Sequence, residues 1–321
     1  MKIKKSLVFL IPCIIFFFSF SYIFLSYYTE YDQWAYHKLY NFLSEQNFKD
    51  LLNLSLDDVK IYLNTSEPLS IFILWVGSYF GLEKNFYISI LNTLFAIFLY
   101  LFLKKNKAPW FIYFFVISNF YFLVLLTAAE RLKIAYIFLL CAILIKNNFI
   151  KNLIFIILPM AHLQLLVVLI GMMIYKLIYS IKLRYIKLID FTKSLFIFIF
   201  LIWVINKVFF PSLTKFLDYK NYGETGGIFD SFFQKSIFLE IFFLYLIKSK
   251  FKFLILSLPA FILSLIIGDW RLNIVIFTLG FYFILIEKKS GNLLFIILMT
   301  YFSLKSVTFL YNVFKYGHGF A

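Results

Sequence analysis

The sequence predicts an all-α integral membrane protein, a polytopic helical bundle of about 9–12 membrane segments that include short or re-entrant helices. Of its 321 residues, 63% are hydrophobic and 15% are charged, whereas soluble domains have about 45–50% and about 25%. The hydrophobic residues gather into runs that approach the ~20 residues of a bilayer-crossing helix. The composition excludes a soluble enzyme, a disordered chain and a disulfide scaffold. It favours a single transmembrane domain over residues 1–321.

The first predicted span is 6–27, which follows Lys2, Lys4 and Lys5. Basic residues favour the cytoplasmic side, so the N-terminus is expected in the cytoplasm. The apolar run is longer than that of a signal peptide, and no small-residue cleavage site follows it. We therefore expect the segment to stay in the membrane.

The longest polar segment is 28–67, which has seven acidic and three basic residues. An acidic loop after a helix that starts in the cytoplasm is expected outside it. A second extracytoplasmic loop is predicted over 211–235.

The remaining predicted membrane segments are apolar runs of unequal length. The run 69–82 is short for a span, and the run 153–175 has basic residues beyond both of its ends. In chain order the runs are 69–82, 86–103, 109–128, 132–145, 153–175, 194–210, 236–247, 253–268, 272–286 and 292–309.

The lysine and arginine distribution gives the topology. We take 69–82 as a dip into the outer leaflet and 153–175 as a hairpin bent near 159–162. The cytoplasmic segments then hold 18 of the 31 basic residues and two of the 16 acidic ones. The net charge of +15 becomes an orientation signal rather than a sign of nucleic-acid binding. These segments are 1–5, 104–107, 146–151, 176–193, 248–252 and 287–290.

This topology gathers unusual polar residues at the outer face, where ionisable groups beside spans indicate function. Irregular backbone at membrane depth lines a cavity or packs within protein, so an outward-facing cavity is expected there. Glu30 and Glu130 belong to this group, and the candidates for direct roles are Asp32, Tyr36, Glu67, Arg131, Lys133, His162, Asp269 and Arg271. His37 and His318 are expected to be solvated.

Four short motifs resemble the EpsG-like family of bacterial polysaccharide polymerases, which are related in role to the Wzy polymerases. Asp32 with Tyr36 resembles its D-x-x-x-Y, and Glu67-Pro68-Leu69 resembles its E-P-hydrophobic motif. Arg131 with Ala135 is similar to R-Q-x-x-A, although Leu132 replaces glutamine. Ala161-His162 is similar to F-H-x-S-A-L, although Gln164 replaces serine. The motifs cover residues 25–180, about half of the chain.

The resemblance implies polymerisation of undecaprenyl-diphosphate-linked repeat units into O-antigen, capsular or exopolysaccharide outside the bacterial cytoplasmic membrane. Its partners would be the lipid-linked donor and acceptor, membrane lipids and a chain-length regulator, with no cofactor or metal. Arg131 and Arg271 would stabilise the leaving diphosphate, with Lys133 as a helper. His162 would be the base, with Glu67 as the second choice.

The other substrate-binding candidates are Asp32, Tyr36 and Asp269. For Asp32 and Tyr36, the implied role is to hold sugar hydroxyls.

Other interpretations stay open. Glu30-Tyr31-Asp32 spells the acid-x-acid pattern of metal-dependent C-type glycosyltransferases, and an O-antigen ligase would share the chemistry with another acceptor. A lipid-linked oligosaccharide flippase is more distant, since no internal repeat is evident. Glu67 with Pro68 also suits an ordinary helix start. Arg131 and Arg271 could simply reach lipid headgroups, and His162 could be a satisfied buried side chain.

Overall fold

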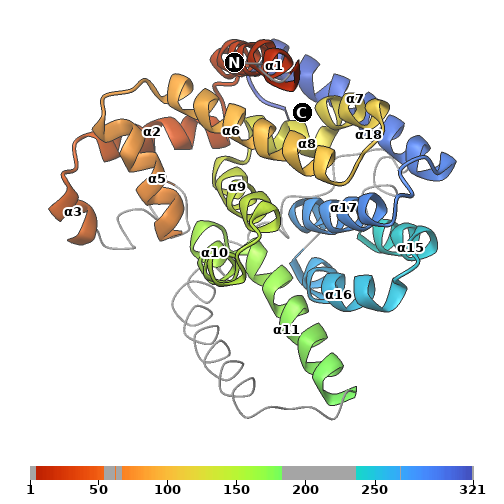
Figure 1. The fold of residues 1–321 in the computed structure, drawn as a ribbon. Helices are drawn as coiled ribbons and strands as arrows, with labels where there is room; N and C mark the ends of the chain where they lie inside the picture. The colour runs from red at the N-terminus through yellow and green to blue at the C-terminus, as the bar shows by residue number, and fades with distance from the viewer. Residues whose placement is uncertain (1–4, 54–61, 63–66, 183–235, 268, 320–321) are drawn as a thin grey trace. The chain divides into compact units, whose positions relative to one another are not determined.

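A computed structural model describes residues 5–53, 62, 67–182, 236–267 and 269–319 (Figure 1). Helices connected by short turns make up this part of the chain, and no strand occurs within it. The predicted span 194–210 and the predicted loop 211–235 lie outside the described residues. The helices are α1 (Lys5–Tyr27), α2 (Asp32–Ser44), α3 (Phe48–Asn53), α5 (Pro68–Tyr79), α6 (Lys84–Lys105), α7 (Trp110–Ser118), α8 (Phe120–Thr127), α9 (Glu130–Leu144), α10 (Asn148–Ala161), α11 (Gln164–Lys182), α15 (Ser236–Leu246), α16 (Lys250–Ile267), α17 (Asp269–Ile286) and α18 (Leu293–Tyr316).

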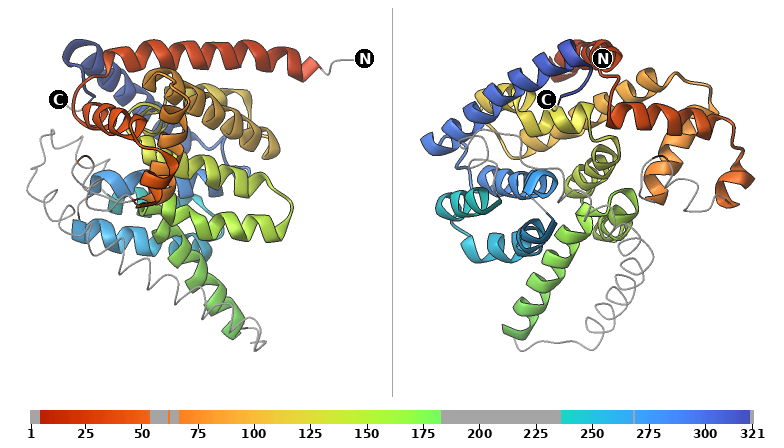
Figure 2. Two further views of the ribbon diagram at one scale, coloured as in Figure 1. Left: turned by 90° about the vertical axis from the view of Figure 1, so that its left-hand side faces the viewer. Right: turned by 180° about the vertical axis from the view of Figure 1, so that it is seen from behind.

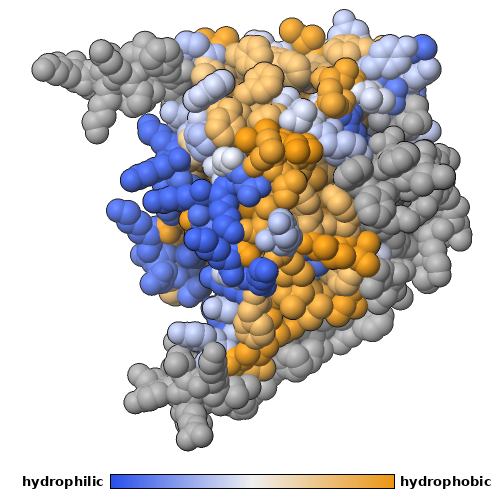
Figure 3. Space-filling view, turned by 90° about the vertical axis from the view of Figure 1, so that its right-hand side faces the viewer, coloured by the Kyte–Doolittle hydropathy of each residue, from blue (hydrophilic) through white to orange (hydrophobic). Residues whose placement is uncertain are grey.

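Two described helices, α6 and α18, are each long and apolar enough to cross a membrane. The number rises to four if the bent pairs α1–α2 and α7–α8 each form one span. Many large apolar side chains are exposed, and the face drawn in Figure 3 carries a wide area of them. Such a surface is typical of helices that contact lipid rather than water. The chain therefore has the features of a membrane protein.

The described helices cluster into two compact units, residues 1–154 with 293–321 and residues 155–292. In the first unit, α1 packs along α6, and α6 packs on α9 (Figure 2). Helix α2 turns away from α1 by 100° and packs on α5. These contacts bring the segments around residues 33, 67, 84 and 131 into one unit.

The predicted span 109–128 is wrong as a single helix, because it breaks at Asn119 and bends by 56°. The Asn119 side chain caps α8 by accepting a hydrogen bond from the Tyr121 N–H at 3.0 Å. Helix α18 covers the break, since the Ser118 and Ser303 hydroxyls lie 2.9 Å apart. Asparagine is a favoured N-cap, so this side chain stabilises an interruption within an apolar run.

The runs 69–82 and 153–175 form a short helix and an interrupted helix, as predicted. The run 69–82 becomes α5, whose 12 residues reach about 18 Å, well short of a ~30 Å hydrocarbon core. The run 153–175 breaks at His162-Leu163, between α10 and α11. That either segment enters and leaves the membrane on the same side remains a prediction.

In the second unit, α16 packs against α11, α15 and α17. Ser257 on α16 donates to the buried Glu240 carboxylate on α15. Glu287, just after α17, accepts hydrogen bonds from the Lys248 and Ser249 N–H groups at 2.6 and 2.9 Å. Burial opposes ionisation of Glu287, but the bonds from Ser249 and Lys248 and the charge of Lys289 outweigh it and lower its pKa.

The topology predicts opposite accessibility at the two ends of α6. In a variant without Cys13 and Cys141, Asn106→Cys is expected to react only with membrane-permeant maleimide, because the Lys104–Lys107 end is predicted to be cytoplasmic. Phe80→Cys, at a position that is 72% exposed, is expected to react with an impermeant maleimide in intact cells. The reverse pattern would contradict the predicted orientation.

Candidate functional site

Three predicted site residues from separate segments meet inside the first unit. A guanidinium N–H of Arg131 on α9 pairs with the carboxylate of Glu67, just before α5. The Arg131 Nε–H donates to the hydroxyl of Tyr36 on α2 at 3.2 Å. The side chains of Arg131 and Glu67 are only 7% and 1% exposed. The predicted topology places these residues together at one face, and the structure joins them directly.

Local sequence explains how each segment presents its side chain. On α2 the buried residues recur at helical spacing, which directs Gln33 and Tyr36 to one face. Pro68 occupies the first turn of α5, and Glu67 precedes it as the N-cap residue. Glu67 thus stands at a helix start, which agrees with the alternative interpretation of Glu67 with Pro68 as an ordinary helix start. Its side chain does not cap that helix, however, and pairs with Arg131 instead.

A second set of buried polar residues adjoins this pair. The Gln33 amide donates to Glu130 Oε1 at 2.9 Å, and its carbonyl oxygen accepts from Lys84. The Glu130 carboxylate also pairs with Lys133 at 2.6 Å, and both of these side chains are fully buried. Glu130 and Arg131 are neighbours at the start of α9. We call the two sets together the buried polar cluster: Gln33, Tyr36, Glu67, Lys84, Glu130, Arg131 and Lys133.

The end of α8 closes the buried polar cluster on one side. The Leu126 carbonyl accepts from Lys133 Nζ at 3.2 Å, and the Thr127 carbonyl accepts from the Gln33 amide. The last carbonyls of a helix have no partner within it, and they carry partial negative charge that favours cations. Lys133 and Gln33 therefore satisfy groups that α8 would otherwise bury unpaired.

The buried polar cluster contains more basic than acidic side chains. Its three basic residues, Lys84, Arg131 and Lys133, lie with two acidic ones, Glu67 and Glu130, and all five are buried. Tyr36 and Glu67 occupy Nε and Nη1 of Arg131. Among the described residues, Nη2 of Arg131 has no hydrogen-bond partner. An anionic ligand that reached Nη2 would satisfy this donor.

Two groups on α2, outside the predicted spans, contribute no charge. Burial raises the pKa of Tyr36 to about 12, so its hydroxyl stays protonated near neutral pH. Burial and the nearby Lys84 ammonium lower the pKa of His37 to about 4. His37, which was expected to be solvated, is half-buried and neutral at pH 7.

The structure does not bring every predicted residue to this cluster. Asp32 lies in the first turn of α2 and is exposed. His162 stands at the break between α10 and α11, in the second unit. Asp269 and Arg271 lie in the first turn of α17, and their side chains are outside the described part. A common site that joins His162, Asp269 and Arg271 to Arg131 remains a prediction.

Sequence reasoning missed Gln33 and Lys84 as members of the cluster. One signal was available for Lys84, which begins a long apolar helix at the end predicted to face outward. A basic residue there runs against the charge distribution, as Arg131 does. Gln33 gave no such signal, because nothing in the sequence relates it to Glu130.

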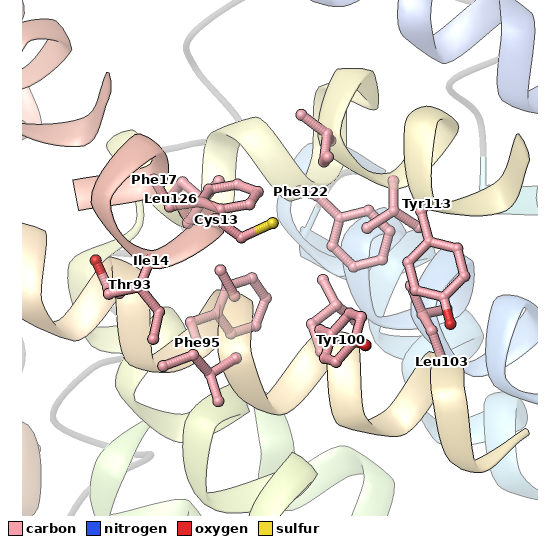
Figure 4. A pocket seen from close by; sticks show the side chains of 15 residues that line it. Cys13, Ile14, Phe17, Thr93, Phe95, Tyr100, Leu103, Tyr113, Phe122 and Leu126 are labelled. Carbon is pink, nitrogen blue, oxygen red and sulfur yellow. The ribbon is translucent and has the colours of Figure 1, made fainter. Parts of the chain in front are cut away.

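The first unit also contains an apolar cavity of about 220 Å³ (Figure 4). Side chains of α1, α6, α7 and α8 line it, among them Phe17, Phe95 and Phe122. Thr93 and two tyrosines are polar exceptions, and no charged residue lines it. The cavity therefore suits a hydrocarbon chain rather than acid–base chemistry, and the buried polar cluster is the better candidate for a functional site.

Comparisons of the chain with protein-family models, with curated proteins and with solved structures give no match.

Proposed function

We propose that this protein is a polytopic polymerase of the bacterial cytoplasmic membrane, with its N-terminus in the cytoplasm and its site facing outward. It joins undecaprenyl-diphosphate-linked repeat units into O-antigen, capsular or exopolysaccharide. A hydroxyl of one lipid-linked unit attacks the anomeric carbon of another, and undecaprenyl diphosphate leaves. The proposal rests on the resemblance to EpsG-like polymerases.

One observation gives the proposal its main support. Tyr36, Glu67 and Arg131 come from three of the four motifs that carry the resemblance, and they form one hydrogen-bonded, buried group. Burying a guanidinium and a carboxylate is costly, so chains tend to retain such a pair where it has a role. The convergence of three separate motifs favours a shared role over three unrelated helix-end residues.

The geometry suits stabilisation of a leaving diphosphate. Glu67 and Tyr36 fix the guanidinium plane of Arg131, and Nη2 remains for a phosphate oxygen. A donor that is held in place before reaction stabilises developing negative charge without reorganising. Lys84 and Lys133 lie in the same cluster as further hydrogen-bond donors. The excess of donors over carboxylates therefore favours an anionic leaving group.

The attacking hydroxyl needs a proton acceptor. Glu67 already accepts a hydrogen bond from Arg131 and is almost fully buried, which favours a positioning role for it. His162 is then the preferred base, since the ordinary pKa of an imidazole lies near neutral pH. Asp32, exposed at the start of α2, is available to sugar hydroxyls.

The alternative functions require different donors, acceptors or metals. A C-type glycosyltransferase would use the Glu30-Tyr31-Asp32 pattern with a divalent metal and a lipid monophosphate donor. A ligase would transfer glycan to an acceptor other than a repeat unit. A flippase would move lipid-linked units without forming a glycosidic bond.

The deciding experiment uses the purified full-length protein with lipid-linked repeat units in excess chelator. We expect a ladder of polymer. His162→Ala and His162→Gln should lower its formation by about 10²–10⁴-fold, the usual contribution of a general base. Met160→Ala, at a partly exposed position of similar size nearby, should leave the ladder unchanged.

Each failure has a separate meaning. Dependence on a divalent metal would favour the C-type glycosyltransferase. A normal ladder from both His162 variants would remove His162 as the base. No polymer from the unaltered protein would contradict the proposed function.

A further inference from the structure

Tyr31, between α1 and α2, has an unusual backbone conformation. Its φ is 52° and its ψ is −123°. A positive φ is uncommon for any residue with a Cβ and is strained for a bulky one. Such a conformation persists only where surrounding contacts hold it. The turn at Tyr31 sets the 100° bend between α1 and α2, so those contacts also set the direction of α2.

The segment after α18 supplies backbone contacts to this turn. The Gly317 carbonyl accepts hydrogen bonds from the Thr29 and Glu30 N–H groups, both at 3.0 Å. Gly317 itself has a φ of 74°. A Cβ added to it would lie 2.8 Å from the Thr29 hydroxyl oxygen and 3.3 Å from Glu30 Cγ. Glycine is therefore required there for both its conformation and its close approach.

Two ring contacts also join the segment after α18 to the residues around the Tyr31 turn. The His318 ring meets the Tyr31 ring edge-on, with centroids 4.5 Å apart at 73°. His318 was expected to be solvated, but its Nδ1 is buried and has no hydrogen-bond partner within the described residues. Beside it, a Cβ on Gly319 would collide with Phe309, whose ring packs on the buried Tyr28. His318 thus acts through packing rather than through a hydrogen bond.

The attached turn leads directly into the buried polar cluster. Helix α2 begins at Asp32, and its first two turns carry Gln33 and Tyr36. Their bonds to Glu130 and Arg131, at 2.9 and 3.2 Å, depend on where α2 starts and on its direction. A change in the turn would therefore displace both partners together.

We propose that Gly317–Gly319 acts as a clasp, a positioning element that holds the Tyr31 turn and so keeps Tyr36 and Gln33 in register with Arg131 and Glu130. The residues of the clasp do not touch the cluster themselves. The effect of the clasp on polymerisation rests on the proposed function. Its effect on the direction of α2 does not.

The test measures the direction of α2 by the distance between two spin labels. The labels occupy Ile23→Cys on α1 and Asn41→Cys on α2, both exposed positions, in a full-length protein without Cys13 and Cys141. One narrow distance distribution is expected. Gly317→Ala, and a chain ended at Tyr316, should broaden or shift it. Gly81→Ala is the matched control, because Gly81 also has a positive φ, 66°, but an added Cβ would meet no atom within 4 Å.

A second pair of variants separates ring packing from other effects. His318→Ala should broaden the distance distribution, whereas His318→Phe should restore it, since the ring makes its contact without a hydrogen bond. In the same proteins, polymerisation should fall by about a hundredfold wherever the distance distribution broadens. A misplacement of a catalytic group by ~1 Å has an effect of this size.

Three results would overturn the proposal. One is an unchanged distribution in both the Gly317→Ala protein and the chain ended at Tyr316. Another is full polymerisation despite a broadened distribution. The third is equal broadening by Gly81→Ala, which would show a general response to backbone strain. If the unaltered protein makes no polymer, the proposed function fails while the distances still test the clasp.

Discussion

Replacing Arg131 by lysine should abolish long-chain glycan while the protein remains in the membrane at its normal level. Lysine keeps the positive charge but lacks the planar fork that binds Tyr36, Glu67 and an incoming oxygen together. We expect polymer formation to fall by about 10²–10³-fold, the effect of removing one preorganised donor to a developing anion. The measurement is the glycan ladder of cells that carry only the variant, with membrane levels from immunoblots.

The matched control is Arg184→Lys, the same exchange in a predicted cytoplasmic segment. It should leave the ladder normal. A normal ladder from Arg131→Lys as well would show that a point charge is enough and would remove the proposed role of the guanidinium fork.

The second large effect is on stability and concerns Glu67. Glu67→Gln would leave the buried Arg131 guanidinium without its carboxylate, and breaking such a pair destabilises a protein by about 3–5 kcal/mol. The midpoint of thermal unfolding in detergent should therefore fall clearly. Joining Glu67→Gln with Arg131→Gln should restore part of the loss, because both charges are then removed.

The control for this exchange is Glu83→Gln, which alters an exposed carboxylate that accepts from Tyr22 at 2.9 Å. It should change the free energy of unfolding by no more than about 0.5 kcal/mol. A Glu67→Gln protein as stable as the Glu83→Gln protein would mean that Arg131 is not truly desolvated beside Glu67.

The sequence predicted the helical class and most helix positions, because long apolar runs have few alternatives to a helix in lipid. It also predicted that α5 is too short to span a membrane and that a break falls at His162. The break at Asn119 was not predicted, because one capping residue in a run of 20 barely changes the hydrophobicity of the run. Besides the Asn119 cap, the break is contacted by α18, almost two hundred residues later.

The buried polar cluster was predictable only in part. Tyr36, Glu67 and Arg131 were found through short motifs and through their conflict with the charge distribution. Gln33 and Lys84 needed the packing of α2 on the other helices, which no local pattern encodes. The attachment of His318 to Tyr31 joins residues at opposite ends of the sequence, and helical periodicity carries no information on such a pair.

The first unit combines residues 1–154 with residues 293–321, so its two parts are synthesised at different times. The turn at Tyr31 and the break at Asn119 both contact α18 or the residues that follow it, which are synthesised after residues 155–292. At ~5–20 residues per second, translation of 155–292 alone takes roughly 7–30 seconds. During that interval the early helices are in the membrane without the partners of their two irregular points. With the proposed clasp, the cluster is complete only after α18 and Gly317–Gly319 have been made.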